Sequence, residues 1–260
     1  MNHNRLALLL ASPIALCTVL AQPSSVAAQG RAIVQPRRVV LVRSPKLAHD
    51  FPDRKKAVIR YPIVRGLSDA SAMRRIQQTL AIKNIFGSTL EEYRQDSWLI
   101  DFDYKVNYNA NYLLDITFSQ SGVAAYPDTQ TKHFLLNLRT GRVVKAADAF
   151  NPDALATLTT LANQKLKTET KTIIKELESD KETSADEKNG IKEQLEQLTF
   201  NRENLDEFSV SEKGVTFLYD AGFPHVIKAL EPDGRYFFSY SELRSHIKSS
   251  GPLSVFIGRK

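Results

Sequence analysis

A long alternation of apolar and polar side chains runs through the middle of the chain. From Trp98 to Tyr108 every second residue is apolar or aromatic, and the alternation resumes over residues 112–119 after Asn109-Ala110-Asn111. A period of two places one set of side chains on a buried sheet face and the other set on a wetter face. The pattern therefore predicts two paired strands joined by a short turn.

A third strand, a tight turn and a long helix are predicted next. Phe134, Leu136 and Leu138 continue the apolar set, and Gly141 can supply the positive φ that a short hairpin turn needs. We expect the helix to begin with Asn151 as its N-cap and Pro152 in its first turn. Its expected buried stripe consists of residues at helical spacing: Leu155, Leu158, Ala162, Leu166, Ile173 and Leu177.

Helices and strands are also predicted on both sides of this central region. A helix capped by Ser68 is expected to reach about Phe86, and the charged run 179–190 is expected to lead into a returning helix over residues 191–200. Three further strands are predicted: residues 215–219, 226–230 and 236–240. Together these elements predict an α+β fold, an antiparallel sheet with helices packed on one face.

The first 28 residues have the pattern of a secretory signal peptide. A positive start is followed by a 16-residue apolar run, which is shorter than the ~20 residues that a membrane-spanning helix needs. Small residues at 26–28 predict cleavage after Ala28, with a cut after Ala21 or retention as an anchor as alternatives. We expect a protein exported to the periplasm or the cell exterior. Because Cys17 is the only cysteine, the processed chain would contain no disulfide.

Positive charge is concentrated early in a chain whose net charge is +6. Residues 31–60 contain nine Lys or Arg against two Asp, and residues 29–56 are predicted to be a basic, extended lead-in. Such a segment could contact an anionic surface, or it could simply be solvated; nucleic-acid binding is not expected of an exported chain. Residues 57–250 are predicted to form one α+β domain with a helical insertion at about 152–200, followed by a C-terminal tail, 251–260.

Catalytic motifs are missing from the sequence. It contains no HExxH, GxSxG, P-loop or GxGxxG pattern, so we expect no enzyme activity, metal or cofactor. One group of residues offers an alternative, because Asp101, Asp103, Asp115 and His133 fall on the expected wet face of neighbouring strands. If they cluster, they could serve a hydrolase in acid–base chemistry or hold a divalent cation. Otherwise they are the solvated side of a one-sided sheet.

Three blocks of sequence carry a family resemblance. Residues 61–66 (YPIVRG), 133–150 (HFLLNLRTGRVVKAADAF) and 208–243 (ending in YSEL) resemble an exported domain known from two settings. These are the extracellular domain of the lysozyme-sensing anti-sigma factor V and the N-terminal region of peptidoglycan deacetylase C. The resemblance spans residues 57–247. It implies an α+β domain outside the cytoplasmic membrane, of largely unknown function, that sometimes binds a muramidase or wall glycan.

The chain departs from this family at one informative place. Relatives often carry Gly-Gly-Ala-His-Pro before the central hairpin, whereas residues 122–127 read Gly-Val-Ala-Ala-Tyr-Pro and Tyr126 replaces the histidine. An exposed aromatic there could stack on a sugar or fill a partner's pocket, although Tyr126 could equally pack beneath the sheet. We therefore expect a non-catalytic binding or envelope-accessory domain that recognises peptidoglycan or a lysozyme-like protein. Tyr126, Asp128 and Gln130 are its candidate contact residues.

Overall fold

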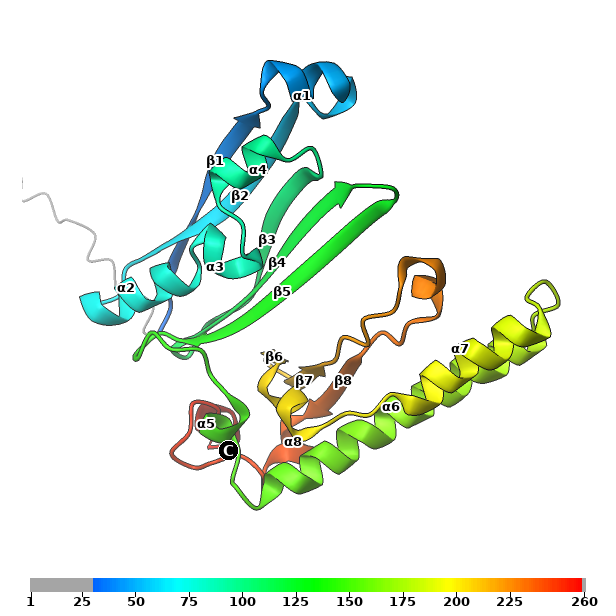
Figure 1. The fold of residues 1–260 in the computed structure, drawn as a ribbon. Helices are drawn as coiled ribbons and strands as arrows, with labels where there is room; N and C mark the ends of the chain where they lie inside the picture. Colours follow the sequence, from blue (N-terminus) through cyan, green and yellow to red (C-terminus); the bar gives the residue numbers. More distant parts are fainter. Residues whose placement is uncertain (1–29, 259–260) are drawn as a thin grey trace, which may run out of the picture.

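Two β-sheets organise the part of the chain that the structure describes, residues 30–258 of a computed structural model (Figure 1). A five-stranded sheet is built by the N-terminal half and a three-stranded sheet by the C-terminal half, and helices cover one face of each. The predicted α+β class is confirmed, but with two sheets instead of one. The expected signal peptide, residues 1–28, lies outside the described residues, so export stays a prediction.

The first sheet is mixed. Its strands follow the order of the sequence: β1 (Ile33–Val42), β2 (Lys56–Arg65), β3 (Leu99–Ala110), β4 (Leu113–Val123) and β5 (Pro127–Asn137). All neighbours are antiparallel except β2 and β3, which run parallel. A parallel pair needs a crossover, and three helices supply it: α2 (Ala70–Thr79), α3 (Ile82–Phe86) and α4 (Leu90–Gln95). The prediction of a purely antiparallel sheet is therefore wrong at this pair.

The predicted alternation matches burial in the centre of β3 and β4 but fails at the start of β3, where Leu99 is buried and Ile100 is 43% exposed next to a shift in register. Phe102, Ile116 and Phe118 are fully buried beneath the crossover helices, while Asp103 and Thr117 lie on the opposite face. The crossover itself differs from the single predicted helix, because it is interrupted after residue 79. Its first helix is capped by Asp69 and not by Ser68: the Asp69 carboxylate accepts the amide of residue 71 at 2.7 Å.

The predicted basic lead-in contains the first strand, β1, followed by a short helix, α1 (Pro45–Asp50), and a 3-10 helix, η1 (Pro52–Arg54). β1 pairs with β2 along its whole length, from Ile33 opposite Arg65 to Val42 opposite Lys56. Residues 39–42 (VVLV) have high strand propensity and Leu41 is fully buried, but the preceding proline and two arginines obscured this strand in the sequence. The segment 29–56 is therefore not a separate extended arm.

Several of its cations are committed to contacts inside the fold. Arg43 is buried and donates to the carbonyl oxygens of Tyr93 and Leu99, and its burial lowers the pKa of the guanidinium, partly offset by the charge of Asp96. Arg54 Nη1 donates to the carbonyl oxygen of Val123 at 2.6 Å. These arginines join the first strands to the ends of β3 and β4 and are not available to an anionic surface.

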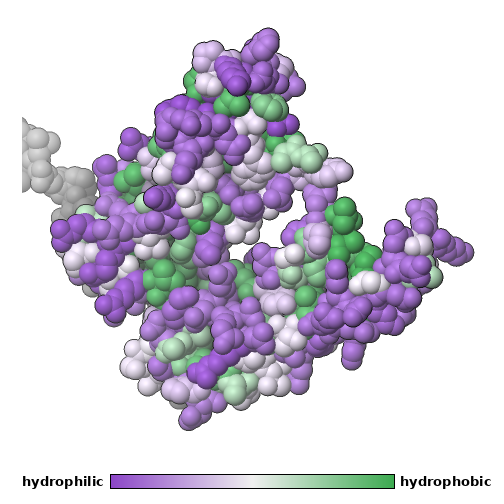
Figure 2. Space-filling view, in the orientation of Figure 1, coloured by the Kyte–Doolittle hydropathy of each residue, from purple (hydrophilic) through white to green (hydrophobic). Residues whose placement is uncertain are grey.

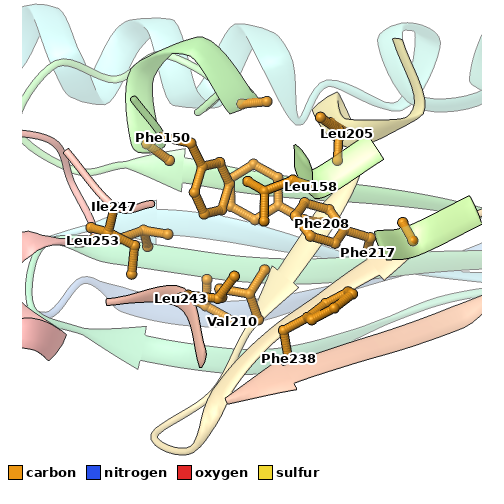
Figure 3. Packing of buried hydrophobic residues seen from close by; sticks show 14 of the residues in the cluster. Phe150, Leu158, Leu205, Phe208, Val210, Phe217, Phe238, Leu243, Ile247 and Leu253 are labelled. Carbon is orange, nitrogen blue, oxygen red and sulfur yellow. The ribbon is translucent and has the colours of Figure 1, made fainter. Parts of the chain in front are cut away.

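The second half is built around a 26-residue helix, α6. Its elements are α5 (Ala146–Ala149), α6 (Ala154–Ser179), α7 (Ala185–Gln197), β6 (Phe208–Val210), β7 (Gly214–Leu218), β8 (Arg235–Ser239), α8 (Tyr240–Leu243) and α9 (Ser254–Ile257). The buried stripe of α6 packs on one face of the small sheet through Leu158 and the ring cluster of Phe150, Phe208, Phe217 and Phe238 (Figure 3). Neighbouring ring centroids are 5.7–6.1 Å apart, the spacing of favourable aromatic pairs.

Three predicted features of this half are wrong. Residues 226–230 were predicted as a strand but lie in a 3-10 helix, η3 (His225–Leu230). The prediction failed because a short apolar run does not distinguish a strand from a helix. Asn151 does not cap α6, which begins at Ala154; its amide donates instead to the carbonyl oxygen of Ser245 at 3.2 Å. The predicted C-terminal tail, as far as it is described, packs inward: Leu253 is fully buried in the second core.

Among residues 30–258 none of the helices combines the length and the apolarity that crossing a membrane requires.

Gly141 gives a direct test of the predicted turn. Its φ is +71°, and an added Cβ would lie 2.3 Å from the carbonyl oxygen of Ala72 in α2. We expect Gly141→Ala to lower the free energy of unfolding by more than about 1 kcal/mol, because backbone strain and this clash add. Gly190→Ala is the matched control, since this site in α7 has open space and helical geometry. It should stabilise by about 0.5–1 kcal/mol in urea unfolding. Equal effects of the two substitutions would contradict the turn geometry.

Candidate functional site: a polar groove between the two sheets

A buried carboxylate joins the two sheets. Asp115 on β4 is fully buried, and its Oδ2 accepts a hydrogen bond from the backbone amide of Val210 on β6 at 2.7 Å. Its other oxygen accepts from Asn107 Nδ2 at 2.7 Å and lies 2.8 Å from His133 Nε2. A carboxylate without water is tolerable only when charge-assisted hydrogen bonds replace its hydration. The three donors meet that need, and one of them belongs to the other half of the molecule.

The side chains around Asp115 are held in turn. Asn107 also donates to Thr117 Oγ1 at 2.8 Å, so its amide bridges two positions on β4. Thr117 is directly opposite His133 in the β4–β5 register, and only 7% of the His133 side chain is exposed. The result is a fixed polar cluster of Asn107, Asp115, Thr117 and His133, which is called the Asp115 cluster below.

Asp101 and Asp103, the other two predicted cluster members, lie apart from Asp115. Both face Arg60 on β2, whose Nη2 is 2.5 Å from Asp103 Oδ2 and 3.9 Å from Asp101 Oδ2. The hydrogen bond to Asp103 and the charge of that carboxylate raise the pKa of the Arg60 guanidinium above its ordinary value. The four candidate residues therefore form two separate groups: an exposed ion-pair group and a buried one. No group of three or more His, Cys, Asp or Glu side chains within residues 30–258 has an arrangement suited to a metal ion.

A groove opens between the polar face of the first sheet and the second sheet. Figure 2 shows the opening between the two halves, and the cavity there has a volume of about 440 Å³. Its lining is mostly polar and comes from both sheets: Asp103, Tyr104, Lys105, Asn107, Thr117, Ser119 and His133 from the first, and Ser209, Leu218 and Arg235 from the second. The Asp115 cluster thus forms part of one wall.

The loop that the sequence singled out lies at the tip of the β4–β5 hairpin and bridges to the second half. Tyr126 is 60% exposed, and its ring stacks on His225 of η3 with centroids 4.8 Å apart and planes inclined by 21°. Tyr126 therefore does not pack beneath the sheet. This stacked pair, called the tip contact below, is a second link between the halves in addition to Asp115.

The other two candidate contact residues differ in how free they are. Gln130 is engaged, because its Oε1 accepts from Gln120 Nε2 at 2.8 Å, and Gln120 in turn accepts from the Tyr93 hydroxyl at 2.6 Å. Asp128 is exposed and accepts the amide of Thr129 at 2.9 Å. All three residues are exposed, but Gln130 is held by its hydrogen bond to Gln120.

No pattern in the sequence points to the groove residues of the second sheet. Ser209 and Arg235 are ordinary polar positions on short strands, and only the meeting of two sheets makes them opposite to Lys105 and Thr117. The alternation in β3 does place Lys105 and Asn107 on the same face as Asp101 and Asp103, so this signal was present for half of the groove.

Comparisons with known proteins establish the fold alone. No protein-family model and no curated protein matches the chain. Several solved structures share the architecture, and two of them are described here. One is a member of the DUF3298 family from Bacteroides fragilis, with 13% sequence identity and a TM-score of 0.54 over 88% of this chain and 97% of that one. The other is a DUF3298 family protein from Pseudomonas aeruginosa, with 11% identity and a TM-score of 0.51 over 84% and 94%. The chain thus has the fold of a domain of unknown function.

Asp115 should be a large contributor to stability. We expect Asp115→Asn to lower the free energy of unfolding by about 2–4 kcal/mol, because an amide leaves one of the buried donors facing another donor. Asp101→Asn is the control, an exposed carboxylate whose loss should cost less than about 0.5 kcal/mol. Urea unfolding of both variants measures the difference. Similar small losses in both would contradict the role of Asp115 as a joint.

The buried hydroxyl of Tyr93 predicts a loss of stability at high pH. Burial raises its pKa to about 12 from an ordinary value of 10.0. Above pH 10 the unfolded chain releases this proton while the folded chain keeps it, so this contribution to stability declines as the pH rises from 10 towards 12. Tyr93→Phe should make the fall of the unfolding free energy between pH 10 and 11 shallower than in the unchanged protein. Parallel slopes would contradict the burial of this hydroxyl.

Proposed function

We propose that this chain is an exported, non-catalytic recognition domain of the cell envelope, and that the groove between the sheets is its binding site for wall glycan. One observation carries the proposal. The groove has hydroxyl, amide and charged side chains on both walls, and its cations Lys105 and Arg235 have no ion-pair partner among the described residues. Unpaired polar groups in a concave site are what a polar ligand needs.

The chemistry of peptidoglycan complements this lining. Sugar hydroxyls both donate and accept, which matches the hydroxyls of Ser119, Thr117 and Ser209. The carboxylates of muramic acid and of the stem peptides are anionic, which matches Lys105 and Arg235. The sequence resemblance of residues 57–247 to exported domains that sometimes bind a muramidase or wall glycan supports the same class of ligand.

A lysozyme-like protein is the alternative partner within this proposal. The exposed ring of Tyr126 and the neighbouring carboxylate of Asp128 would then form the contact, at the tip of the hairpin and outside the groove. The two partners use different residues, so substitutions distinguish them.

Hydrolysis is the second candidate function. His133 lines the groove, and its Nε2 lies 2.8 Å from Asp115 Oδ1, as in an acid–base pair. Its weakness lies in the same hydrogen bonds. Both carboxylate oxygens of Asp115 are engaged, one of them by a backbone amide, and little of His133 is exposed. A general base needs direct access to the proton that it removes, so this geometry favours a structural role.

Binding to soluble peptidoglycan fragments tests the groove. Lys105→Ala and Arg235→Ala should each weaken binding by about tenfold, because each removes a charge-assisted hydrogen bond to the ligand. Lys171→Ala, which removes an exposed lysine of α6 outside the groove, is the charge-matched control and should bind normally. Isothermal titration at physiological and at raised salt measures the affinities. The full chain is used throughout.

The other outcomes each have a distinct meaning. Equal weakening by all three substitutions, together with loss of binding at raised salt, would reduce the interaction to non-specific charge attraction. Binding of a c-type lysozyme that is lost in Tyr126→Ala and kept in Lys105→Ala would assign recognition to the hairpin tip. Release of reducing ends from the fragments that disappears in His133→Gln would establish the hydrolase.

A further inference from the structure

The outer edge of β8 is open. Tyr219 donates to the carbonyl oxygen of Gly234, and the amide of Tyr240 donates to Lys213, so even-numbered positions of β8 point their backbone groups at β7. The backbone groups of Arg235 and Phe237 therefore point away from β7. No other strand among residues 30–258 pairs with this edge.

The remaining sheet edges are shielded over at least part of their length. β1 carries Pro36 followed by two arginines, devices that discourage edge pairing. β5 lies against β6, and the outer side of β6 is occupied where Val210 donates to Asp115. β8 has neither proline nor a covering element, and the ring of Phe237 at its centre is 43% exposed.

A groove runs along this open edge, beside α6. Its volume is about 890 Å³, and apolar parts of Leu161, Tyr236, Phe238 and Leu243 contribute to its lining. A further strand would lie ~4.8 Å from β8 in the plane of the sheet and would cover this lining. The groove is thus placed to receive an extended segment.

We propose that the β8 edge pairs antiparallel with the β8 edge of a second copy of this chain, so that the two small sheets become one six-stranded sheet. The pair would be centred on Phe237, whose amide and carbonyl groups would bond to those of the partner's Phe237. Such a contact is twofold symmetric and closed. It ends at Ser239, whose amide is already engaged by Glu242 Oε2 at 2.7 Å.

Charge complementarity selects a second copy as the occupant. At the N-terminal end of β8, Arg235 extends from the strand, and Glu169 of α6 accepts from the Asp233 amide at 2.6 Å and the Tyr236 hydroxyl at 3.0 Å. At the other end the signs are reversed: Lys165 Nζ lies 4.8 Å from the centre of the Phe238 ring, and Glu242 caps α8.

A twofold axis midway between the two Phe237 residues brings the N-terminal end of each β8 next to the C-terminal end of the partner's β8. It places Arg235 at the end that carries the partner's Glu242, and Glu169 at the end that carries the partner's Lys165. Opposite charges therefore meet both along the paired strands and between the two α6 helices, and like charges are kept apart. A parallel approach of two copies would set each charge against its own kind.

Sedimentation equilibrium of the full chain under reducing conditions tests this pairing. We expect the mass to rise from one copy to two with increasing concentration. Phe237→Pro should hold the protein at one copy, because proline removes the outward amide and leaves the β7 pairing intact. Thermal unfolding at a concentration where both proteins are single copies confirms that this variant folds.

A charge-exchange series provides an independent arm that does not depend on the proline variant. Lys165→Glu and Glu169→Lys should each weaken self-association by about tenfold or more, since each sets like charges opposite each other. An equimolar mixture of the two variants should recover association, because every contact then joins opposite charges. Lys171→Glu, elsewhere on α6, is the control and should associate normally.

Three results would overturn the proposal. The first is a single-copy mass at every concentration. The second is association that both Phe237→Pro and the charge variants leave unchanged. The third is a single-copy protein whose Phe237 amide becomes protected from hydrogen exchange only when an extended peptide is added, which would assign the edge to another partner. None of these outcomes bears on glycan binding by Lys105, which lies on the first sheet.

Discussion

The carboxylate of Asp115 is fully buried, so hydrogen bonds from protein groups have to replace its water shell. The positions of these donors determine how the two sheets meet. Two of its hydrogen-bond donors come from the first sheet, but the third is the amide of Val210 in the second. A buried charge that lost one donor would be costly, so the halves are held in one relative position at this point. The small sheet then packs its aromatic face against α6 and turns its other face towards the groove.

The groove follows from having two links with space between them. Asp115 joins the sheets at β6, and the tip contact joins the β4–β5 hairpin to η3. Between these links the side chains that line the groove are mostly polar on both walls, and Lys105 and Arg235 form no ion pair among the described residues. The first sheet thus uses its apolar face for stability, beneath the crossover helices, and its polar face for the candidate site.

Much of the first sheet could be predicted because local pattern and tertiary environment agree there. The alternation that identifies β3 and β4 also assigns Phe102 and Asp103 to opposite faces. Asp115 shows the limit of this reasoning, because its position in the pattern is equivalent to that of Asp103, yet it is fully buried and Asp103 is paired at the surface. The difference arises from Val210, 95 residues later, and no local pattern contains that contact.

The second half was harder to predict, for similar reasons. η3 occupies the short apolar run that was predicted as a strand at residues 226–230, and such a run is compatible with either structure. Asn151 has the chemistry of a cap, but its side-chain amide donates to the carbonyl oxygen of Ser245. At Asn151 a residue 94 positions away therefore decided between two locally acceptable structures.

The tip contact has a consequence for how a ligand reaches the groove. Tyr126 meets His225 at one link and Asp115 meets Val210 at the other, so the two halves are joined at two separate points. If the groove binds wall glycan as proposed, a short fragment can enter it from an open side. A long polymer without a nearby end would have to wait until the stacked rings of Tyr126 and His225 separate. The lifetime of one exposed aromatic pair would then limit the association rate for intact wall but not for its fragments, and the protein would sense whether the polymer has been cut.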